Sequence, residues 1–423
     1  MAATRFHRVV IFLLFAITVV NYIDRAAISY AIPAIEQQLG LSKAAAGTIL
    51  GAFGLGYAVT TLIGGFAVDR YGARLVLSIA AVLWSLSIGL TGLASGFLTL
   101  YLARTLLGMA EGPNFSAVTG AVERWLPPAR QASALSYALV AVPVALACGG
   151  PIVTQLLAAL GWRGTFAVLF ALSLVWVPLW YFLFRDDPAQ SRQVNAQELA
   201  FIREGQKAEA APVRRWPRMS EVRVLLTNRT LLVNYWAFFV FGYFLFFFMA
   251  WLPSYLQQSY GLNLAAVGAF TVLPWLCAAV ALWALGRWSD HLLQTTGRLR
   301  MSRSYLIAGT QLVAALAVVP VAFSASLPVA IACISLAVAA SMGANAAYFA
   351  VNVDIVPEKA ATALGIMDFC FALAGFVAPV ITGFVLSLRG SFADGFALMA
   401  VLALSSVVLV LAFHRPDEDR AIP

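Results

Sequence analysis

Hydrophobic residues in this chain gather into long continuous runs that short polar segments separate. A helix needs about 20 mostly apolar residues to cross the hydrocarbon core of a membrane. By that criterion the pattern predicts twelve membrane-spanning helices in the 423 residues. They are expected at 9–35, 46–68, 75–95, 97–122, 131–159, 164–184, 230–257, 264–286, 304–324, 327–352, 360–387 and 392–413. The runs are too long and continuous for the alternating strands of a membrane β-barrel.

The composition supports the same class. Hydrophobic residues make up 62% of the chain and charged residues 11%, whereas a soluble domain has roughly 45–50% and about 25%. This excess excludes a soluble globular enzyme and a disordered chain, and it indicates an all-α membrane protein. The four cysteines all lie inside apolar runs without metal-ligand spacing, so they are expected to behave as small apolar residues.

The positions of the positive charges predict the orientation in the membrane. Of the 27 lysines and arginines, Arg25 and Arg104 lie inside predicted spans. The odd-numbered connections contain Lys43, Arg163 and Arg389, and the other 22 lie in the termini and even-numbered connections. Both termini and the central loop are therefore expected in the cytoplasm. This topology explains the net charge of +8, and no nucleic-acid partner is expected.

One long polar stretch, 185–229, divides the predicted spans into six and six. The prediction is an N-terminal six-helix bundle over 1–184, a cytoplasmic central loop, and a second bundle with a short tail over 230–423. The loop is interpreted as a solvated linker, although a hinge or regulatory segment would give the same pattern. Three short motifs recur in both halves at offsets of 221, 228 and 226 residues, beginning at Gly65 and Gly286, Gly150 and Ala378, and Arg163 and Arg389. Such repeats predict two bundles related by pseudo-two-fold symmetry, with a substrate site near the midplane between them.

Charged residues inside the predicted spans are the candidates for chemistry. A charge near the bilayer centre costs about 2.5 kcal/mol or more, so it usually has a partner and a task. Arg104 and Glu111 are seven residues apart and share one helix face, whereas the neighbours Asp24 and Arg25 diverge by about 100°. An arginine offers a planar charged fork that suits a carboxylate. We hypothesise that a substrate carboxylate takes over such an arginine, and that the acid left without its partner then takes up a proton.

Segment 65–74, which reads GFAVDRYGAR, lies in a short basic turn after the second span. On this motif the chain resembles the major facilitator superfamily. Within that superfamily it resembles the anion:cation symporter family, which includes sugar-acid transporters and sialin-like carriers. Four further motifs carry the second resemblance, namely NYIDR at 21–25, RTLLGMAEGP at 104–113, WLPSY at 251–255 and SDHLLQTTG at 289–297.

The resemblance implies roles for individual residues. It implies carboxylate binding by Arg25 and a cavity lined by Tyr22 and Tyr57. It implies that Asp24 and Glu111 accept protons and that Arg104 is the partner of Glu111 and helps to couple the events. The alternative is that these charges only hold the first span against the fourth. It also implies a latch between the two halves, formed by Gly65, Asp69, Arg70, Gly72 and Arg74, with Asp290 as the counterpart in the second half, although a turn that only fixes topology would have the same composition.

In the second half, Asp368 lies within span 11. It is a candidate proton site or substrate contact, and a neutral acid bonded to a neighbouring helix is the alternative. The other candidate substrate contacts are Tyr243, Asn345, Tyr348 and Asn352. The aromatic run 238–248 stands where the resemblance implies an asparagine in sugar-acid carriers. It favours a less hydroxylated or aromatic carboxylate, unless these phenylalanines face lipid or pack inside the bundle.

Together these patterns predict a secondary active transporter that imports an organic anion with protons by alternating access. The expected substrate is a sugar acid (an aldonate, aldarate or hexuronate) or another carboxylate. The alternatives are a proton-coupled exporter or antiporter on the same fold and a non-transporting membrane sensor. No enzymatic activity, cofactor or metal is expected, because the sequence has no nucleotide loop, metal cluster or nucleophile elbow. The expected form is a monomer in a bacterial inner membrane.

Overall fold

The computed structural model describes residues 4–206, 219–324 and 326–419, and every regular element in these ranges is a helix. Before the central loop the helices are α1 (Phe6–Leu39), α2 (Lys43–Gly92), α3 (Phe97–Glu111), α4 (Asn114–Trp125) and α5 (Pro128–Leu183). We call this part the N-half. Short helices η1 (Pro188–Gln190), α6 (Ala196–Arg203) and α7 (Met219–Thr227) belong to the loop.

The part after the loop is called the C-half. Its long elements are α8 (Arg229–Tyr260), α9 (Leu264–Phe270), α10 (Val272–Thr296), α11 (Tyr305–Val321), α12 (Leu327–Gly343), α13 (Asn345–Ile355), α14 (Ala360–Arg389) and α15 (Ala393–Phe413). Three shorter elements complete it, namely η2 (Arg300–Ser304), η3 (Pro357–Lys359) and α16 (Pro416–Asp419). The prediction of an all-helical protein is confirmed.

Each predicted span coincides with one helix, part of a long helix, or two helices in line. Within the described ranges, nine helical segments are long and apolar enough to cross a membrane. That number is below twelve because α2 and α5, of 50 and 56 residues, each contain two predicted spans. Gly72 and Gly161 interrupt them with φ values of 80° and 64°, a conformation that glycine adopts without steric cost. The fourth predicted span is instead divided between α3 and α4 at Gly112 and Pro113.

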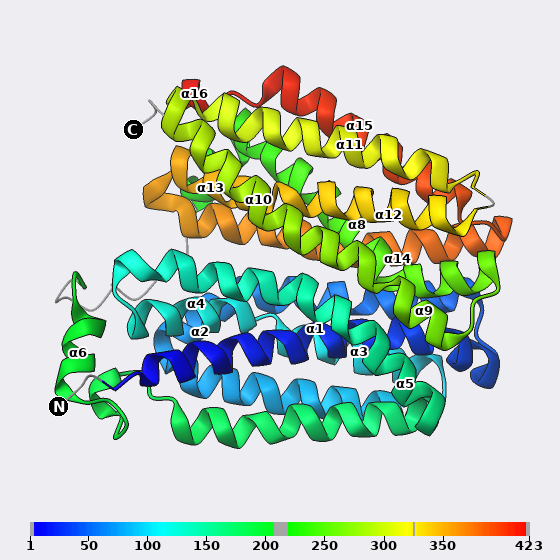
Figure 1. The fold of residues 1–423 in the computed structure, drawn as a ribbon, viewed down its shortest axis with the longest axis horizontal. Coiled ribbons are helices and arrows are strands. Elements are labelled where there is room, and N and C mark those ends of the chain that lie inside the picture. The colour runs from blue at the N-terminus through cyan, green and yellow to red at the C-terminus, as the bar shows by residue number, and fades with distance from the viewer. Residues whose placement is uncertain (1–3, 207–218, 325, 420–423) are drawn as a thin grey trace.

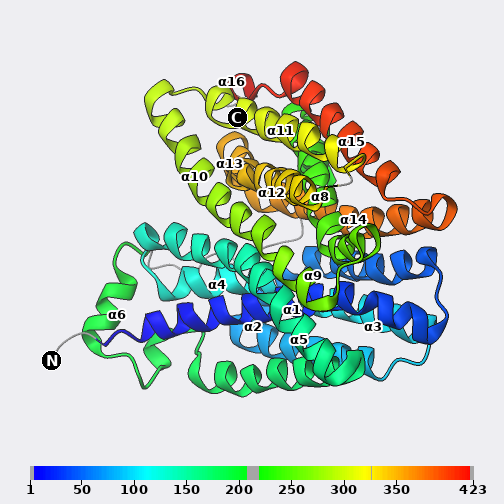
Figure 2. The ribbon, with the colours of Figure 1, turned by 45° about the vertical axis from the view of Figure 1, so that its right-hand side comes forward.

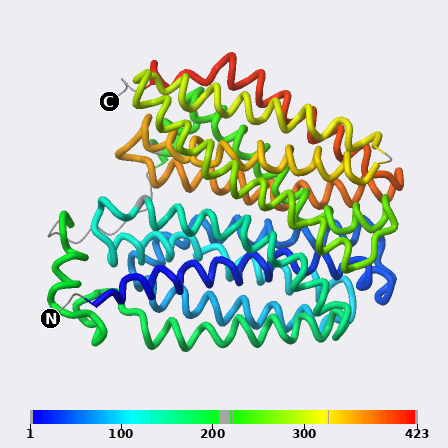
Figure 3. The backbone as a smooth tube through the Cα atoms, in the orientation of Figure 1, coloured from blue at the N-terminus to red at the C-terminus, as the bar shows by residue number. Residues whose placement is uncertain are grey.

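The two halves form two layers of helices. Figure 1 shows α1 to α5 side by side in the lower layer and α8 and α10 to α15 in the upper layer, with α9 beside α5 and with α6 and both chain ends at the left. Figure 2 and Figure 3 show the same separation. The layers touch where α2 meets α14, where α5 meets α9 and α10, and where α1 meets α8. A site between the halves would therefore be lined by these helices.

Helix α8 contains the aromatic run and lies inside the protein. Every residue from Val240 to Leu256 is buried, so this part of the run does not face lipid. Phe241 and Phe246 pack against Phe371 of α14, with ring centroids 5.8 and 5.0 Å apart. The aromatic helix thus forms the inner wall of the C-half, where it faces the N-half.

Candidate functional site

The centre of the candidate site is a buried ion pair between α1 and α3. The Nε and Nη2 atoms of Arg25 donate to Oε2 of Glu111 over 3.0 and 2.8 Å. Nη2 also donates to Oδ1 of Asn21 over 3.2 Å. The two charged side chains are 2% and 0% exposed. An ion pair this deeply buried requires close geometry to offset the loss of hydration of both charges.

Arg104 adds a second positive charge beside this pair. Its Nη2 atom donates to the backbone carbonyl of Arg25 over 3.3 Å. Its Nε and Nη1 atoms are buried and have no hydrogen-bond partner among the described residues. The cluster therefore holds two guanidinium groups and one carboxylate, which leaves one buried positive charge without an opposite charge. An anion that entered here would find unsatisfied donors.

Glu111 is paired with Arg25, whereas the family resemblance implied a pairing with Arg104. The distance along the helix explains the difference. Seven residues correspond to about 10 Å of rise, so Arg104 and Glu111 share one face of the helix without meeting. Arg25 lies on the facing helix and reaches Glu111 from the side. The hydrogen-bonded partner of Glu111 in this structure is therefore Arg25.

Aromatic rings hold the two guanidinium groups in place. The Cζ atom of Arg25 lies 4.4 Å from the ring centroid of Tyr22, 4.4 Å from that of Phe53 and 5.1 Å from that of Tyr57. Phe53 also contacts Arg104, over 5.3 Å. Cation–π contacts of this kind stabilise a desolvated cation. The structure thus brings the predicted residues Tyr22, Tyr57 and Arg25 together, and it adds Phe53.

Asp24 forms a separate polar site inside the N-half. Its Oδ2 atom accepts a hydrogen bond of 2.6 Å from the hydroxyl of Ser173 on α5. Its Oδ1 atom is buried without a partner in the described part of the chain. The divergence of neighbouring helical residues places Asp24 toward α5 and Arg25 toward α3. The two acids Asp24 and Glu111 are therefore held by different partners.

Asp368, the acidic candidate of the C-half, lies on α14 and is half-buried. A role as a proton site or substrate contact stays a prediction for this residue. The remaining C-half candidates lie in other surroundings.

Tyr348 and Asn352 belong to a polar cluster within the C-half. The Tyr348 hydroxyl accepts a hydrogen bond of 2.8 Å from Gln311, and its backbone carbonyl accepts bonds from Asn234 and Asn352. Tyr243 lies next to Thr382 of α14 and is fully buried. None of these three contacts joins the C-half to Arg25.

Asn345 is one of four described C-half amides whose buried side-chain oxygen has no hydrogen-bond partner, together with Asn234, Gln311 and Asn352. It is the first residue of α13, next to the break in the tenth predicted span. Its Oδ1 atom is buried without a hydrogen-bond partner among the described residues. A role as a substrate contact stays a prediction for Asn345, as it does for Tyr243, Tyr348 and Asn352.

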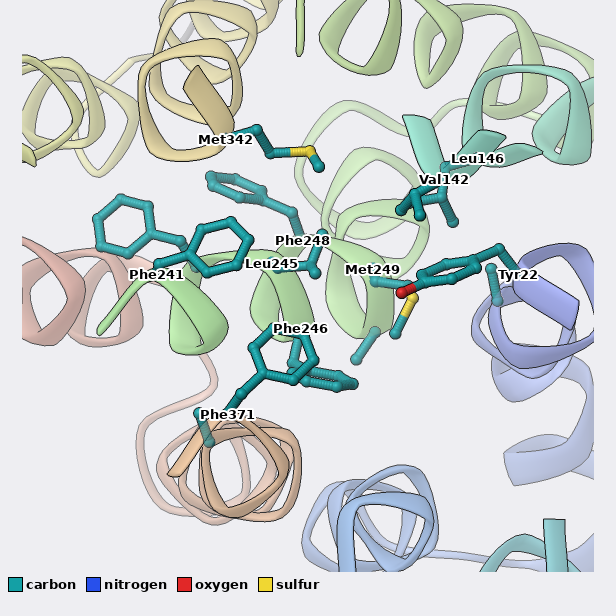
Figure 4. Close-up of a cluster of buried hydrophobic side chains, with 14 of the residues drawn as sticks. Tyr22, Val142, Leu146, Phe241, Leu245, Phe246, Phe248, Met249, Met342 and Phe371 are labelled. Atoms are coloured by element: carbon teal, nitrogen blue, oxygen red, sulfur yellow. The ribbon is translucent and has the colours of Figure 1, made fainter. Parts of the chain in front are cut away.

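Two small cavities lie between the halves near the Arg25 cluster. Each leaves about 10 Å³ in which the centre of a water molecule can move, which is room for about one water. The first is bordered by Arg25, Arg104 and Phe53 on the N-half side. Met249 of α8 lines both cavities, and Figure 4 shows its side chain next to Tyr22 of α1. No organic anion fits unless the halves separate.

The two halves are in direct contact near the end of the molecule away from the chain termini. A methyl group on Gly47 of α2 would lie 2.5 Å from the carbonyl oxygen of Pro379 and 2.8 Å from Cα of Gly383. Tyr30 of α1 donates a hydrogen bond of 3.1 Å to Thr271, which precedes α10. These contacts close the site at that end.

The segment predicted as a latch contacts the N-half in this structure. The backbone amide of Arg74 donates to Asp186 over 3.2 Å, and its Nε donates to the carbonyl of Tyr181 over 2.8 Å. Gly72 lies against the same Asp186 carboxyl, and Arg124 pairs with it over 3.3 Å. These contacts join the turn after the second span to the end of α5.

The counterpart in the C-half is Asp290. It pairs with Arg303 over 3.1 Å, and Arg303 also lies 3.5 Å from Asp354. These contacts lie within the C-half. A latch between the halves, including Gly65, Asp69 and Arg70, stays a prediction.

Several residues of the site were missed by sequence reasoning. Asn21 lies one helical turn before Arg25, and Phe53 lies one turn before Tyr57, so helical spacing could have identified both. Ser173, Asn234 and Gln311 are polar residues in mostly apolar spans. Their polarity was a signal, but their partners are distant in the sequence, and only the tertiary structure brings them together.

Comparison with known proteins identifies the family. The model of the Major Facilitator Superfamily matches residues 14–379. The chain therefore belongs to the major facilitator superfamily, and it is a multi-pass membrane transporter.

Relatives match over nearly the whole chain. It is 34% identical to a hexuronate transporter of Bacillus subtilis, over 96% of this chain and 94% of that protein. It is 33% identical to a probable sulfoacetate transporter of Cupriavidus necator, over 94% and 93%. Among solved structures, it resembles a bacterial homolog of the human lysosomal transporter Spinster in an inward-facing and occupied conformation. That match has a TM-score of 0.79 and 16% identity, and it covers 99% of this chain and 98% of that one.

Proposed function

We propose that this protein imports an organic anion together with protons by alternating access. The observation that carries the proposal is the buried cluster of two arginines and one glutamate beside the cavities between the halves. Its uncompensated positive charge suits a carboxylate, and its buried acid suits a proton. The names of relatives support the substrate class, since they include a hexuronate transporter and a probable L-galactonate transporter.

The coupling step follows from the partner exchange at Arg25. The substrate carboxylate accepts the hydrogen bonds that Arg25 now gives to Glu111. Glu111 is left as a buried acid without its partner, and it takes up a proton because a lone buried carboxylate is costly. Asp24, held by Ser173, and Asp368 of α14 are the proposed additional proton sites.

The transport cycle rocks residues 1–184 against 230–423 around this site, with 185–229 as the connecting loop. In the present structure the contacts of α2 with α14 and of α5 with α9 close one end. The distribution of lysines and arginines supports a cytoplasmic location for both termini, so the closed end faces outward. A bacterial inner membrane is the proposed location. A latch formed by 65–74 and Asp290 would act in the opposite, inward-closed state.

The test is uptake of labelled carboxylates by purified protein in liposomes with an imposed pH gradient. The panel contains a hexuronate, an aldonate, a small dicarboxylate and an aromatic acid. Uptake should require the gradient, be lost in Arg25→Ala, and become independent of pH in Glu111→Gln. Arg389→Ala is the matched control, because this arginine is 72% exposed at the end of α14. Full uptake by Arg25→Ala, or gradient-independent uptake by the wild type, would contradict the proposal.

A further inference from the structure

The two halves contribute opposite chemistry to the space between them. The polar side chains around the first cavity, Arg25, Ser29 and Arg104, all come from the N-half. The C-half contributes only apolar side chains to this cavity, namely Phe246, Met249, Ala250 and Pro379. A ligand at this position would therefore have its charged end against the N-half.

The second cavity continues the apolar surface. It shares Met249 with the first cavity and is otherwise lined by Ala26, Tyr30, Leu146, Phe248, Leu252, Pro253, Thr271 and Trp275. The two hydroxyl groups in that set are already used, because Tyr30 donates to Thr271 and Thr271 donates to the carbonyl of Gly268. Figure 4 shows Met249 of α8 next to Tyr22, and Phe246 of the same helix beside Phe371.

The described amide side chains of the C-half core do not border either of the two cavities. Gln311 donates to the Tyr348 hydroxyl and to the carbonyl of Ala237, each over 2.8 Å. Asn234 and Asn352 both donate to the carbonyl of Tyr348. The C-half wall of the first cavity, opposite Arg25, is therefore apolar, and among the described residues it offers no side-chain hydrogen-bonding partner to a ligand.

We propose that the preferred ligand is a monocarboxylate with an aromatic or branched apolar body. Its carboxylate would bind Arg25 and Arg104, and its body would pack against Phe246, Phe248 and Met249. One uncompensated positive charge in the cluster matches a monoanion. This inference rests on the proposed function, because it assumes that the Arg25 cluster binds the transported anion.

The apolar wall acts against polyhydroxylated acids. A hydroxyl buried without a partner lowers affinity by roughly tenfold, and a sugar acid has several hydroxyls. An aromatic ring instead gains contact with the neighbouring rings. The inference therefore predicts a different preferred ligand for this chain than the name of the hexuronate transporter indicates for that relative, although the two sequences are 34% identical.

The test compares phenylacetate with glucuronate by titration calorimetry on the full-length protein in detergent. Binding is measured because a weak aromatic acid also crosses membranes without a carrier. Phenylacetate is expected to bind at least about tenfold more tightly. Phe246→Asn should narrow this ratio, whereas Phe246→Leu should retain it. Leu232→Ala, at an exposed position of the same helix, is the control for changes in α8.

The outcomes distinguish the inference from the function on which it rests. Glucuronate binding as tight as phenylacetate binding would overturn the inference and leave the proposed function in place. Failure of both acids to bind, together with no uptake of any carboxylate in the liposome panel, would overturn both. An unchanged ratio in Phe246→Asn would also overturn the inference. If Phe246→Asn does not fold, Met249→Gln replaces it, because this substitution places an amide at both cavities. Met249→Gln should likewise narrow the ratio of the two affinities, and an unchanged ratio would overturn the inference.

Discussion

Arg25 and Arg104 are both buried, yet only Arg25 has a carboxylate partner. The two arginines should therefore contribute differently to stability and to binding. Removal of one member of a buried ion pair leaves the other charge unpaired, at a cost of about 3–5 kcal/mol. Removal of an arginine that has no opposite charge instead relieves a desolvation cost. Arg25 thus supports the fold as well as the ligand, whereas Arg104 is retained at the expense of stability.

Arg104→Gln should weaken anion binding without lowering stability. A hydrogen bond to a charged group contributes about 1.5–3 kcal/mol, so affinity for a carboxylate should fall by roughly 10- to 100-fold. The temperature of unfolding should stay the same or rise, whereas Arg25→Ala should lower it. Calorimetric titration and thermal unfolding in detergent measure the two effects. A large loss of stability in Arg104→Gln with unchanged affinity would assign Arg104 a purely structural role.

Part of the N-half site could be predicted because its residues on α1 lie close together in the sequence. Tyr22, Asp24 and Arg25 occupy one turn of α1, and a charge in an apolar span is conspicuous. The direction of the Tyr348 side chain could not be predicted in the same way. An apolar helix that is buried all round gives no periodicity to tell which face meets the cavity. The partners of Tyr348 come from α8 and α11, and only packing brings them together.

The helices illustrate a second limit of sequence reasoning. Hydropathy located the predicted spans within the observed helices, because bilayer thickness sets their length. It did not predict that α2 and α5 would each continue through a turn at a single glycine. The close contact of α2 with α14 was also absent from the prediction. It depends on glycines such as Gly47 and Gly383, whose small size matters only when the two helices meet.

Gly47→Ala should shift the protein away from the conformation closed at this end. The added methyl group would lie 2.5 Å from the carbonyl oxygen of Pro379, so α2 and α14 would have to move apart. A cysteine introduced at Ile28, beside the first cavity, should then react faster with a membrane-impermeant thiol reagent added on that side. The experiment uses a parent protein in which the four native cysteines are replaced, so that the reagent labels the introduced cysteine alone.

The control for this experiment is Gly309→Ala. A methyl group at Gly309 of α11 meets nothing within 4 Å, so the same substitution should leave the labelling rate unchanged. Equal labelling rates in Gly47→Ala and the parent protein would show that the α2–α14 contact does not hold this end closed.

On the scale of the whole molecule, the central loop is attached to the N-half. Glu198 of α6 accepts hydrogen bonds from the backbone amide and from Nδ1 of His7, each over 2.7 Å, and one from the Thr4 hydroxyl. The backbone amide of Asn195 donates to the same Thr4 hydroxyl over 3.0 Å. Because α6 lies on the start of α1, this part of the loop should move with the N-half when the two halves rock.

The Glu198 contact should depend on the charge of the carboxylate. Burial alone would raise the pKa of Glu198, but the hydrogen bonds from His7 and Thr4 outweigh it and hold the pKa below the usual 4.5. The stabilisation is therefore complete at neutral pH and is lost as the pH falls through this lowered pKa. Glu198→Gln removes the charge at every pH, so amide hydrogen exchange across 196–203 should be faster than in the wild type at pH 7. Glu204→Gln, at an exposed position just after α6, should leave that exchange unchanged. Equal exchange in the wild type and Glu198→Gln would show that the apolar contacts of α6, such as Phe201 against the His7 ring, hold the loop in place without the carboxylate.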